Sequence, residues 1–350
     1  MTAEAIDLLK QLIRIPSPSR EEQGAADLIE SYLRSKSLEV SRHGNNVWTI
    51  APDYSPSKPT LLLDAHLDTV KAVSGWTHDP YGAEETADGT IYGLGANDDG
   101  ASLVSLMHAF LAVSHEPLPY NLIFSASSEE EVSGRGGLES ALPLMPAIDF
   151  AIIGEPTGMQ PAIAERGLMV IDVTTHGRSG HAARGEGDNA IYKALDDINW
   201  IRTHQFSNVS EHLGPVMMTA TIISAGTVHN VIPDTCTYTI DVRSNGLYTN
   251  EELLTEISSH IQGEAKARST RLHSTELSMT HPVVQKLIDM GYHPFGSPTL
   301  SNRALVRVPS LKMGPGDSAR SHTADEYIRT AEIADAIERY TDILHNIVIR

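Results

Sequence analysis

The N-terminal part of the chain alternates between amphipathic helical patterns and short runs that are continuously apolar. Apolar residues recur at helical spacing over residues 21–34 and 101–113, which predicts two amphipathic helices. The apolar runs at residues 60–63, 121–126 and 150–153 have strand length and are uninterrupted. Strands of a parallel sheet are buried on both faces and show this pattern. We therefore expect an α/β fold in which a mixed, largely parallel sheet is flanked by helices.

The pattern changes near residue 164, where strand-like alternation replaces the long apolar runs. The segments expected here are strands near 170–174, 218–223 and 236–242 and helices near 189–203 and 251–261. Helical core patterns then return at 282–290 and 331–347. We therefore predict a discontinuous first domain, residues 1–163 and 282–350, interrupted by an inserted α+β domain over residues 164–281.

The charge balance restricts the partners of the protein. The 350 residues carry 26 basic and 45 acidic side chains, a formal net charge of −19. Binding of nucleic acid needs a clustered basic surface, so we expect no nucleic acid partner. No apolar run has the length of a membrane span. The single cysteine, Cys236, lies in an alternating strand pattern, where we expect it to pack in the core. These features favour a cytoplasmic protein without membrane association.

A glycine-rich segment before the helix at 101–113 carries the first chemical signal. Gly93 and Gly95 begin a Gly-x-Gly pattern, but Asp98 occupies the position of the third glycine of a dinucleotide-binding fingerprint. A carboxylate at that position would repel a pyrophosphate, which argues against a dehydrogenase. A carboxylate is suited instead to holding a cation.

Three of the expected strands lead into acidic residues or histidine. The first is followed by His66 and Asp68, the second by the acidic stretch 129–131, and the third by Glu155. The carboxyl ends of parallel strands share one crevice, so we expect these side chains to lie close together. A further histidine, His322, lies in a loop of small residues. Imidazole and carboxylate ligands together suit zinc, cobalt or manganese.

Five short motifs occur in an order that resembles a known family. The motifs are His66-Leu67-Asp68-Thr69-Val70, Gly93-Leu94-Gly95-Ala96-Asn97-Asp98, Glu129-Glu130-Glu131-Val132, Gly154-Glu155-Pro156-Thr157 and Ser321-His322. Their order resembles that of the co-catalytic metallo-aminoacylases and carboxypeptidases of the M20 type, and the chain looks most similar to the acetylornithine deacetylase group. The resemblance covers nearly the whole chain. It implies two divalent metal ions per chain, with zinc expected and cobalt or manganese as alternatives.

The resemblance also assigns roles to the residues of these motifs. The implied ligands are His66 and Glu155 for one ion, Glu131 and His322 for the other, and Asp98 as the bridge between both. Asp68 would accept the second N–H of His66 and fix the orientation of its ring. Glu130 would be the general base that takes a proton from a water between the ions. A cis peptide bond is implied after Asp98.

The inserted domain resembles the dimerisation, or lid, domain of the same family. The stretch 177–183 contains His181, which the resemblance places at the active site of the partner chain in a homodimer, where it would stabilise an oxyanion. Asn230 and Arg243 lie in segments that resemble substrate-contacting ones, and a guanidinium pairs well with a carboxylate. Without the resemblance, His181 is a loop histidine and Arg243 is a surface charge.

Two further features leave alternatives open. Thr323-x-x-Glu326 fits a helix capping box, and this interpretation competes with a role for Glu326 near the site. Asn302 stands in a region where many relatives carry an aspartate, which leaves the substrate specificity open.

The resemblance implies a metal-dependent amidohydrolase that removes the acyl group from an N-acyl amino acid. The expected reaction is deacetylation of N-acetylornithine or N-acetylcitrulline in arginine biosynthesis. One alternative is desuccinylation of N-succinyl-ornithine, N-succinyl-citrulline or N-succinyl-diaminopimelate, and another is dipeptide hydrolysis. An alternative of a different class is a metal-free binding protein without activity, although none of the metal-ligand positions is lost from the sequence.

Overall fold

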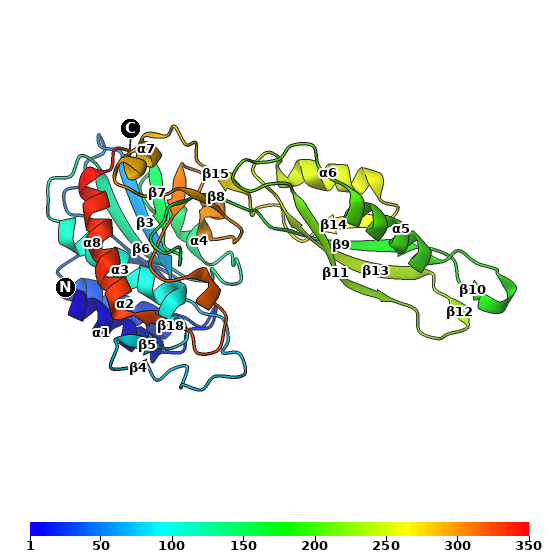
Figure 1. Cartoon of the computed structure of the whole chain (residues 1–350), viewed down its shortest axis with the longest axis horizontal. Coiled ribbons are helices and arrows are strands. Elements are labelled where there is room, and N and C mark those ends of the chain that lie inside the picture. The colour runs from blue at the N-terminus through cyan, green and yellow to red at the C-terminus, as the bar shows by residue number, and fades with distance from the viewer. Residues whose placement is uncertain (350) are drawn as a thin grey trace. The chain divides into compact units, whose positions relative to one another are not determined.

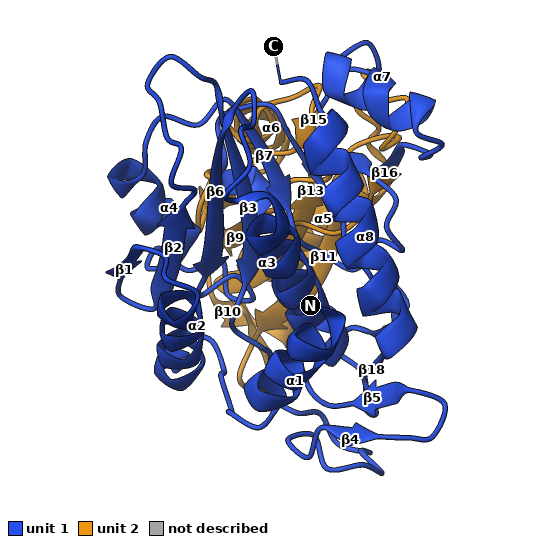
Figure 2. Ribbon diagram, turned by 90° about the vertical axis from the view of Figure 1, so that its left-hand side faces the viewer, with its two compact units in different colours: residues 1–163, 277–295, 301–350 blue, residues 164–276, 296–300 orange. Residues whose placement is uncertain are grey.

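The computed structural model describes residues 1–349 and divides them into two compact units. Unit 1 contains Met1–Ile163, Leu277–Phe295 and the described part of the chain from Ser301 onward. Unit 2 contains Ala164–Glu276 and the short segment Gly296–Leu300. Figure 2 distinguishes the two units by colour. The return of 296–300 to unit 2 is a feature that the sequence patterns do not indicate, because the segment is too short to carry a periodicity.

Unit 1 is built on a mixed sheet with the strand order β1-β2-β6-β3-β7-β17-β8, followed by β15. Four neighbours, β6, β3, β7 and β17, are parallel, and the strands toward both edges are antiparallel. The strands are β1 (Val40–His43), β2 (Asn46–Ile50), β3 (Thr60–His66), β6 (Asn121–Ser127), β7 (Phe150–Ile153), β8 (Ala162–Glu165), β15 (Thr275–Glu276), β16 (Phe295–Ser297), which pairs with β8, and β17 (Ser310–Lys312). The expected α/β fold with a mixed sheet is confirmed.

Helices cover both faces of this sheet. Those of unit 1 are α1 (Thr2–Ile13), α2 (Gln23–Ser35), α3 (Ala101–Val113), α4 (Leu138–Ala141), α7 (Pro282–Asp289) and α8 (Thr330–Asn346). Figures 1 and 2 show α1, α2, α3 and α8 gathered on one face. Along β3, Leu61 and Leu63 pack into the core beneath these helices, and Leu62 packs into the core on the α4 side. The uninterrupted apolar run is therefore explained by burial on both faces.

The parallel pairing places the carboxyl ends of the central strands at one edge. His66 at the end of β3 lies opposite Ser127 at the end of β6, and Asp64 lies opposite Ile153 at the end of β7. A small sheet of β4 (Glu84–Glu85), β5 (Thr90–Tyr92) and β18 (Tyr327–Arg329) joins segments far apart in sequence. The short turn η1 (Ala96–Gly100) leads from β5 toward α3.

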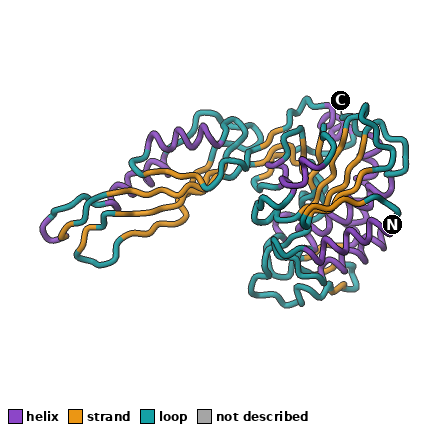
Figure 3. Tube along the Cα trace, turned by 180° about the vertical axis from the view of Figure 1, so that it is seen from behind, coloured by secondary structure: helices purple, strands orange, loops and turns teal. Residues whose placement is uncertain are grey.

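Unit 2 is a four-stranded antiparallel sheet with two helices on one face, as Figure 3 shows. Its strands are β9 (Met169–His176), β11 (Met217–Ala225), β13 (Thr235–Arg243) and β14 (Glu264–Ala267), and its helices are α5 (Ala190–Thr203) and α6 (Asn250–His260). Alternate residues of β9 are buried against the helices, which explains why apolar and polar residues alternate along its sequence. Cys236 is fully buried in this core, as predicted.

A two-stranded ribbon, β10 (Gly180–His181) with β12 (Val231–Ile232), extends from the unit 2 sheet. Among the described residues of the whole chain, none of the helices combines the length and the apolar character that crossing a membrane requires.

Candidate metal centre

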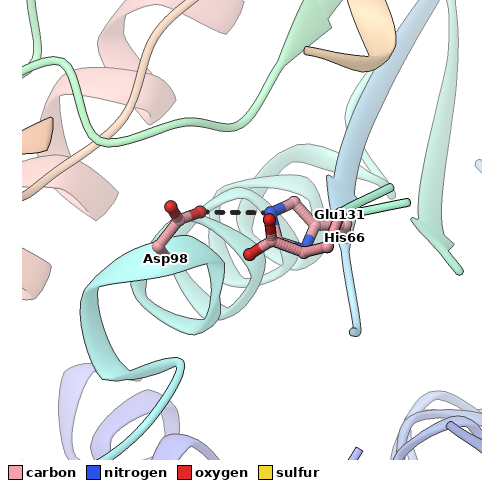
Figure 4. A group of neighbouring side chains, drawn as sticks. All are labelled: His66, Asp98 and Glu131. Carbon is pink, nitrogen blue, oxygen red and sulfur yellow. Dashed lines mark hydrogen bonds and ion pairs between the residues drawn. The ribbon is translucent and has the colours of Figure 1, made fainter. Parts of the chain in front are cut away.

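The strand ends of unit 1 bring histidine and carboxylate side chains together. His66 lies at the end of β3, and its Nε2 atom is 3.1 Å from Oδ1 of Asp98, which lies in η1. Glu131, from the loop after β6, reaches the same point, as Figure 4 shows. One potential ligand atom from each of these three residues lies within 4.8 Å of the others.

A second group overlaps with the first. His66, Glu130 and Glu155 also place one ligand atom each within 4.8 Å of the others. His322, from the loop before β18, joins the cluster, with its Nε2 atom 3.0 Å from Glu131 and 3.8 Å from Asp98. The structure therefore brings all five predicted metal ligands and the predicted base into one cluster in unit 1, and Asp98 contacts both histidines.

The chemistry of these side chains fits divalent cations. Two ligand atoms bound to one ion at about 2.1 Å lie at most about 4.2 Å apart, so the observed spacings need only a small adjustment. One histidine on each side of the shared Asp98 gives two sites that each combine imidazole with carboxylate oxygen, a set that suits first-row metals.

The carboxylates repel one another in the absence of a positive charge. Burial raises the pKa of Glu130 well above its usual value, and the neighbouring carboxylate of Glu131 adds to the rise. Burial also raises the pKa of Glu155. The hydrogen bond to Glu131 raises the pKa of His322 to about 9. A bound divalent ion would favour the charged carboxylates and the neutral imidazole, so it would reverse these shifts.

Asp68 supports the cluster in a way that differs from the sequence prediction. The Nδ1 atom of His66 is 2.8 Å from the main-chain carbonyl oxygen of Asp68, whereas the nearest carboxylate oxygen is 3.7 Å away. The carboxylate instead accepts the main-chain N–H groups of Glu130 and Glu131 at 3.0 and 3.1 Å. The predicted hydrogen bond from the ring is thus made by the carbonyl of the same residue, because the carboxylate is occupied by the loop after β6.

Buried side chains hold the first four main-chain N–H groups of that loop. The N–H of Ser128 donates to Oδ1 of Asn46 at 3.0 Å, and the N–H of Glu129 donates to Oε1 of Glu22 at 3.1 Å. Together with the two hydrogen bonds to Asp68, these contacts fix four consecutive peptide groups. Glu22 and Asn46 are both fully buried. They lie far from the loop in sequence, and neither is part of a recognisable pattern, so the sequence analysis missed them.

Glu326 fixes the segment that carries Asp98. Its Oε1 atom accepts the main-chain N–H groups of Asn97 at 2.9 Å and Asp98 at 3.0 Å. The capping box predicted from Thr323 and Glu326 is wrong, because the chain enters strand β18 at this point and α8 begins only at Thr330. The competing interpretation, a place for Glu326 near the site, agrees with the contacts. The peptide bond between Asp98 and Asp99 is cis.

Asn302 lies in the buried layer beneath the strand ends. Its side-chain amide donates to Oδ2 of Asp64 at 3.2 Å and to the hydroxyl of Ser127 at 2.9 Å. Burial raises the pKa of Asp64 to about 7. Asn302 thus supports β3 and β6 directly behind His66.

The three predicted residues of the inserted domain lie in unit 2, at two separate places. His181 and Asn230 are neighbours, because the N–H after His181 donates to the carbonyl oxygen of Asn230 at 3.0 Å. Arg243 ends β13, and its guanidinium pairs with Asp241 through Nε at 2.7 Å and Nη2 at 3.1 Å. The nine residues of β13 cover about 27 Å at a rise of about 3.4 Å per residue. Within one unit 2, Arg243 is therefore remote from His181.

The cluster of two histidines and four carboxylates, formed by the strand ends of the sheet together with η1 and the loop before β18, is typical of a metallohydrolase with two adjoining metal sites. The family model described as peptidase family M20/M25/M40 matches residues 62–346, and the chain belongs to this family. It is a metal-dependent hydrolase that acts on an amide bond. Solved structures support the fold. A metallo-carboxypeptidase from Sulfolobus solfataricus has a TM-score of 0.76 at 16% identity, over 98% of this chain and 99% of that chain.

Two named relatives have comparable identity. A succinyl-diaminopimelate desuccinylase from Corynebacterium glutamicum is 29% identical over 366 residues, 96% of this chain and 94% of that protein. An acetylornithine deacetylase from Pectobacterium atrosepticum is 29% identical over 309 residues, 83% of this chain and 80% of that protein. A solved structure described as a dinuclear metal binding peptidase from Bacillus subtilis has a TM-score of 0.75 at 14% identity, over 98% and 97% of the two chains. A particular similarity to the deacetylase group is not confirmed.

The contacts of Glu130 and Glu131 predict opposite outcomes for their alanine variants. Glu131→Ala removes the carboxylate that contacts His322, so we expect the protein to lose bound metal. Glu130→Ala should keep its metal, while kcat falls by roughly 10²–10⁴-fold, as is typical when an acid–base group is lost. Metal content by elemental analysis and kcat on the same samples test this assignment.

Glu129→Ala is the matched control, because the Glu129 carboxylate turns away to the N–H of Gly136 and to Arg20. It should keep both metal and activity. If Glu130→Ala loses metal and Glu131→Ala keeps it, the two roles are exchanged.

Proposed function

We propose that the protein hydrolyses N-acyl amino acids and that the preferred acyl group is succinyl. The observation that supports amide hydrolysis is the single cluster of His66, Asp98, Glu131, Glu155 and His322 with Glu130 beside it. Two bound divalent ions, zinc in the first instance, would lower the pKa of a water and polarise the acyl carbonyl group.

Glu130 is suited to moving the proton in this reaction. Its main-chain N–H is fixed by Asp68, so the carboxylate has a defined starting point beside His66 and Glu155. In the proposed reaction it takes a proton from the attacking water and delivers it to the leaving amine nitrogen. Breaking the amide bond then leaves a carboxylic acid and a free amino acid.

A pair of arginines in unit 2 supports a substrate with more than one carboxylate. Arg166 and Arg243 lie on neighbouring segments, because the N–H of Gly167 donates to the carbonyl oxygen of Ser244 at 3.3 Å. Burial and the positive charge of Arg243 lower the pKa of Arg166. Arg166 donates to the main-chain carbonyl oxygens of Leu213 and Pro215. Each guanidinium has five N–H groups, which leaves donors on both for carboxylates. An N-succinyl amino acid offers one carboxylate on the acyl group and another on the amino acid, whereas an N-acetyl group offers none.

The comparison with relatives also favours N-succinyl over N-acetyl substrates. The desuccinylase from Corynebacterium glutamicum aligns with 96% of the chain, and the name recurs among other relatives. Deacetylation of N-acetylornithine or N-acetylcitrulline is the second candidate, supported by the acetylornithine deacetylase relative. We rank dipeptide hydrolysis below both, since it would use the same cluster but the relatives that support the first two candidates are a desuccinylase and a deacetylase.

We further propose a homodimer in which each site is completed by two chains. His181 is exposed, and its Nδ1 atom accepts the N–H of Ala183 at 3.1 Å, which places the ring proton on Nε2 as a donor for an oxyanion. A single small substrate cannot contact both His181 and Arg243 of one unit 2, because β13 separates them. In a homodimer, the substrate could contact Arg243 of one chain and His181 and Asn230 of the other.

Unit 2 also offers an apolar surface for such a dimer. β11 is an edge strand, and its neighbour α5 packs against it. Both expose large apolar side chains, namely Tyr192, Leu195, Met217, Ile222 and Ile223. Several exposed large apolar side chains on two neighbouring elements favour a protein–protein interface. The one cysteine, buried and reduced, suits a cytoplasmic location.

A hydrolysis panel tests the substrate class. We expect kcat/KM to be higher for N-succinyl-diaminopimelate and N-succinyl-ornithine than for N-acetylornithine and N-acetylcitrulline, because only the succinyl group carries a carboxylate for the second arginine. Release of free amine is measured for each compound at equal enzyme and metal concentrations. A higher kcat/KM for the acetyl compounds would establish the deacetylase alternative.

Arg166→Ala tests the reason for that preference. It should raise KM for the succinyl substrates by roughly 10-fold or more, as expected for the loss of about 1.5–3 kcal/mol of charged hydrogen bonding, and should change KM for N-acetylornithine much less. Arg268→Ala is the control, since Arg268 is an exposed arginine of the same unit that pairs with Asp172. An equal effect on both substrate types would contradict the assigned role of Arg166.

Mixed dimers test the shared site. One inactive variant carries His181→Ala and the other Glu130→Ala. After subunit exchange, one of the two sites in a mixed dimer has an intact Glu130 from one chain and an intact His181 from the other, so activity should return to about half of the wild-type value per mixed dimer. Exchange is verified with differently tagged chains. Verified exchange without recovered activity, or full activity of His181→Ala alone, would exclude the shared site.

A further inference from the structure

Asn97 joins the two loops that carry Asp98 and His322. Its side chain is fully buried, and its Nδ2 group donates to the carbonyl oxygen of Asp317 at 3.1 Å and to the hydroxyl of Ser321 at 3.2 Å. Its Oδ1 atom accepts the N–H of Asp317 at 3.0 Å. The residue thus stands directly before one cluster carboxylate and contacts the residue directly before one cluster histidine.

The contact is close and leaves no room for a larger neighbour. A Cβ atom at Gly316 would lie 2.2 Å from Oδ1 of Asn97, and Gly316 has a φ of +85°. Glycine is therefore required there for both space and backbone conformation. The loop is also tied on its other side, since the N–H of Gly158 donates to the carbonyl oxygen of Gly316 at 2.8 Å. This hydrogen bond links the loop to the segment that also carries Glu155.

The main chain around Asn97 is fixed independently of its side chain. Glu326 accepts the N–H groups of Asn97 and Asp98, so Asp98 keeps a defined position even if the Asn97 side chain is removed. The side chain of Asn97 makes three hydrogen bonds to the loop 317–322, whereas the Asp98 carboxylate approaches His322 of that loop only at 3.8 Å. The side chain of Asn97 therefore acts on the position of His322 more than on that of Asp98.

We propose that Asn97 is a positioning residue that sets the separation of His322 from Asp98 and thereby the affinity for the metal ion on the His322 side. This inference rests on the two-ion site of the proposed function. The ion on the His66 side depends on His66 and Glu155, whereas the hydrogen bonds of the Asn97 side chain go to Asp317 and Ser321. Loss of the Asn97 amide should therefore lower the binding affinity for the ion on the His322 side more than that for the ion on the His66 side.

Titration of the metal-free protein with cobalt(II) chloride tests the proposal without any substrate. In Asn97→Ala, the dissociation constant of one ion should rise by roughly 10–100-fold, the usual cost of losing a group that orients a metal ligand, and that of the other ion should change much less. The visible absorption of the second cobalt equivalent should change as well, because it reports the coordination geometry.

Asn121→Ala is the matched control. Asn121 is a buried asparagine of the same unit that holds a distant loop in the same way, donating to the carbonyl oxygens of Ser55 at 2.9 Å and Lys58 at 3.1 Å and accepting the N–H of Ser55. It begins β6, whose other end lies at the site. It should lower the thermal unfolding midpoint and leave both cobalt affinities and the absorption spectrum unchanged.

Two results would overturn the proposal. One is that the dissociation constants of both cobalt ions are unchanged in Asn97→Ala, and the other is that Asn97→Ala and Asn121→Ala weaken cobalt binding equally. If Asn97→Ala does not fold, Ser321→Ala is the second test. It removes one acceptor of the Asn97 amide and should also raise the dissociation constant of the ion on the His322 side. A wild-type protein that binds fewer than two ions would overturn this inference together with the two-ion site. If the wild type binds two ions but hydrolyses no acyl amino acid, the substrate proposal fails and the role of Asn97 is still decided by the titration.

Discussion

The mutual repulsion of four carboxylates is the constraint on which the site depends. Asp98, Glu130, Glu131 and Glu155 meet within a few ångströms at the ends of β3, β6 and β7. Burial, together with neighbouring negative charge, raises the pKa of Glu130 and Glu155, because their charged forms are unfavourable there without a cation. Such a cluster persists only if the surrounding chain fixes the backbone of each carboxylate. The same repulsion is what makes the site favourable for divalent ions.

The surrounding chain meets this requirement with buried side chains that accept main-chain N–H groups. Asn46, Glu22 and Asp68 hold residues 128–131, and Glu326 holds Asn97 and Asp98. The loops that carry the reactive groups are thus irregular in conformation but fully hydrogen bonded at these positions. Loops at the ends of parallel strands can adopt many conformations, and here the side chains of other elements select one. A positioned metal ligand costs less to immobilise when the ion binds.

Unit 2 adds a different kind of constraint. Its core is independent of the sheet in unit 1, with separate apolar clusters around β9 and β13. Arg166 and Arg243 lie on hydrogen-bonded neighbouring segments, whereas His181 and Asn230 lie beyond the other end of β13. A small substrate can use only one of these pairs from a given chain. The proposed dimer follows from this separation, and the exposed apolar side chains of β11 and α5 provide a surface on which it can form.

The sequence by itself determined the features that depend on local pattern. Uninterrupted apolar runs predicted β3, β6 and β7. The histidine and acidic residues after them supplied three of the five predicted ligands, His66, Glu131 and Glu155, because parallel strands deliver their ends to one edge. Tertiary structure alone decided which atoms make the supporting contacts. Glu22, Asn46 and Asn97 act on loops remote in sequence, Asp68 uses its carbonyl oxygen for His66, and Glu326 holds the Asp98 segment instead of capping a helix. Such hydrogen bonds depend on the distances between packed elements, and these distances cannot be predicted from the local pattern of apolar and polar residues.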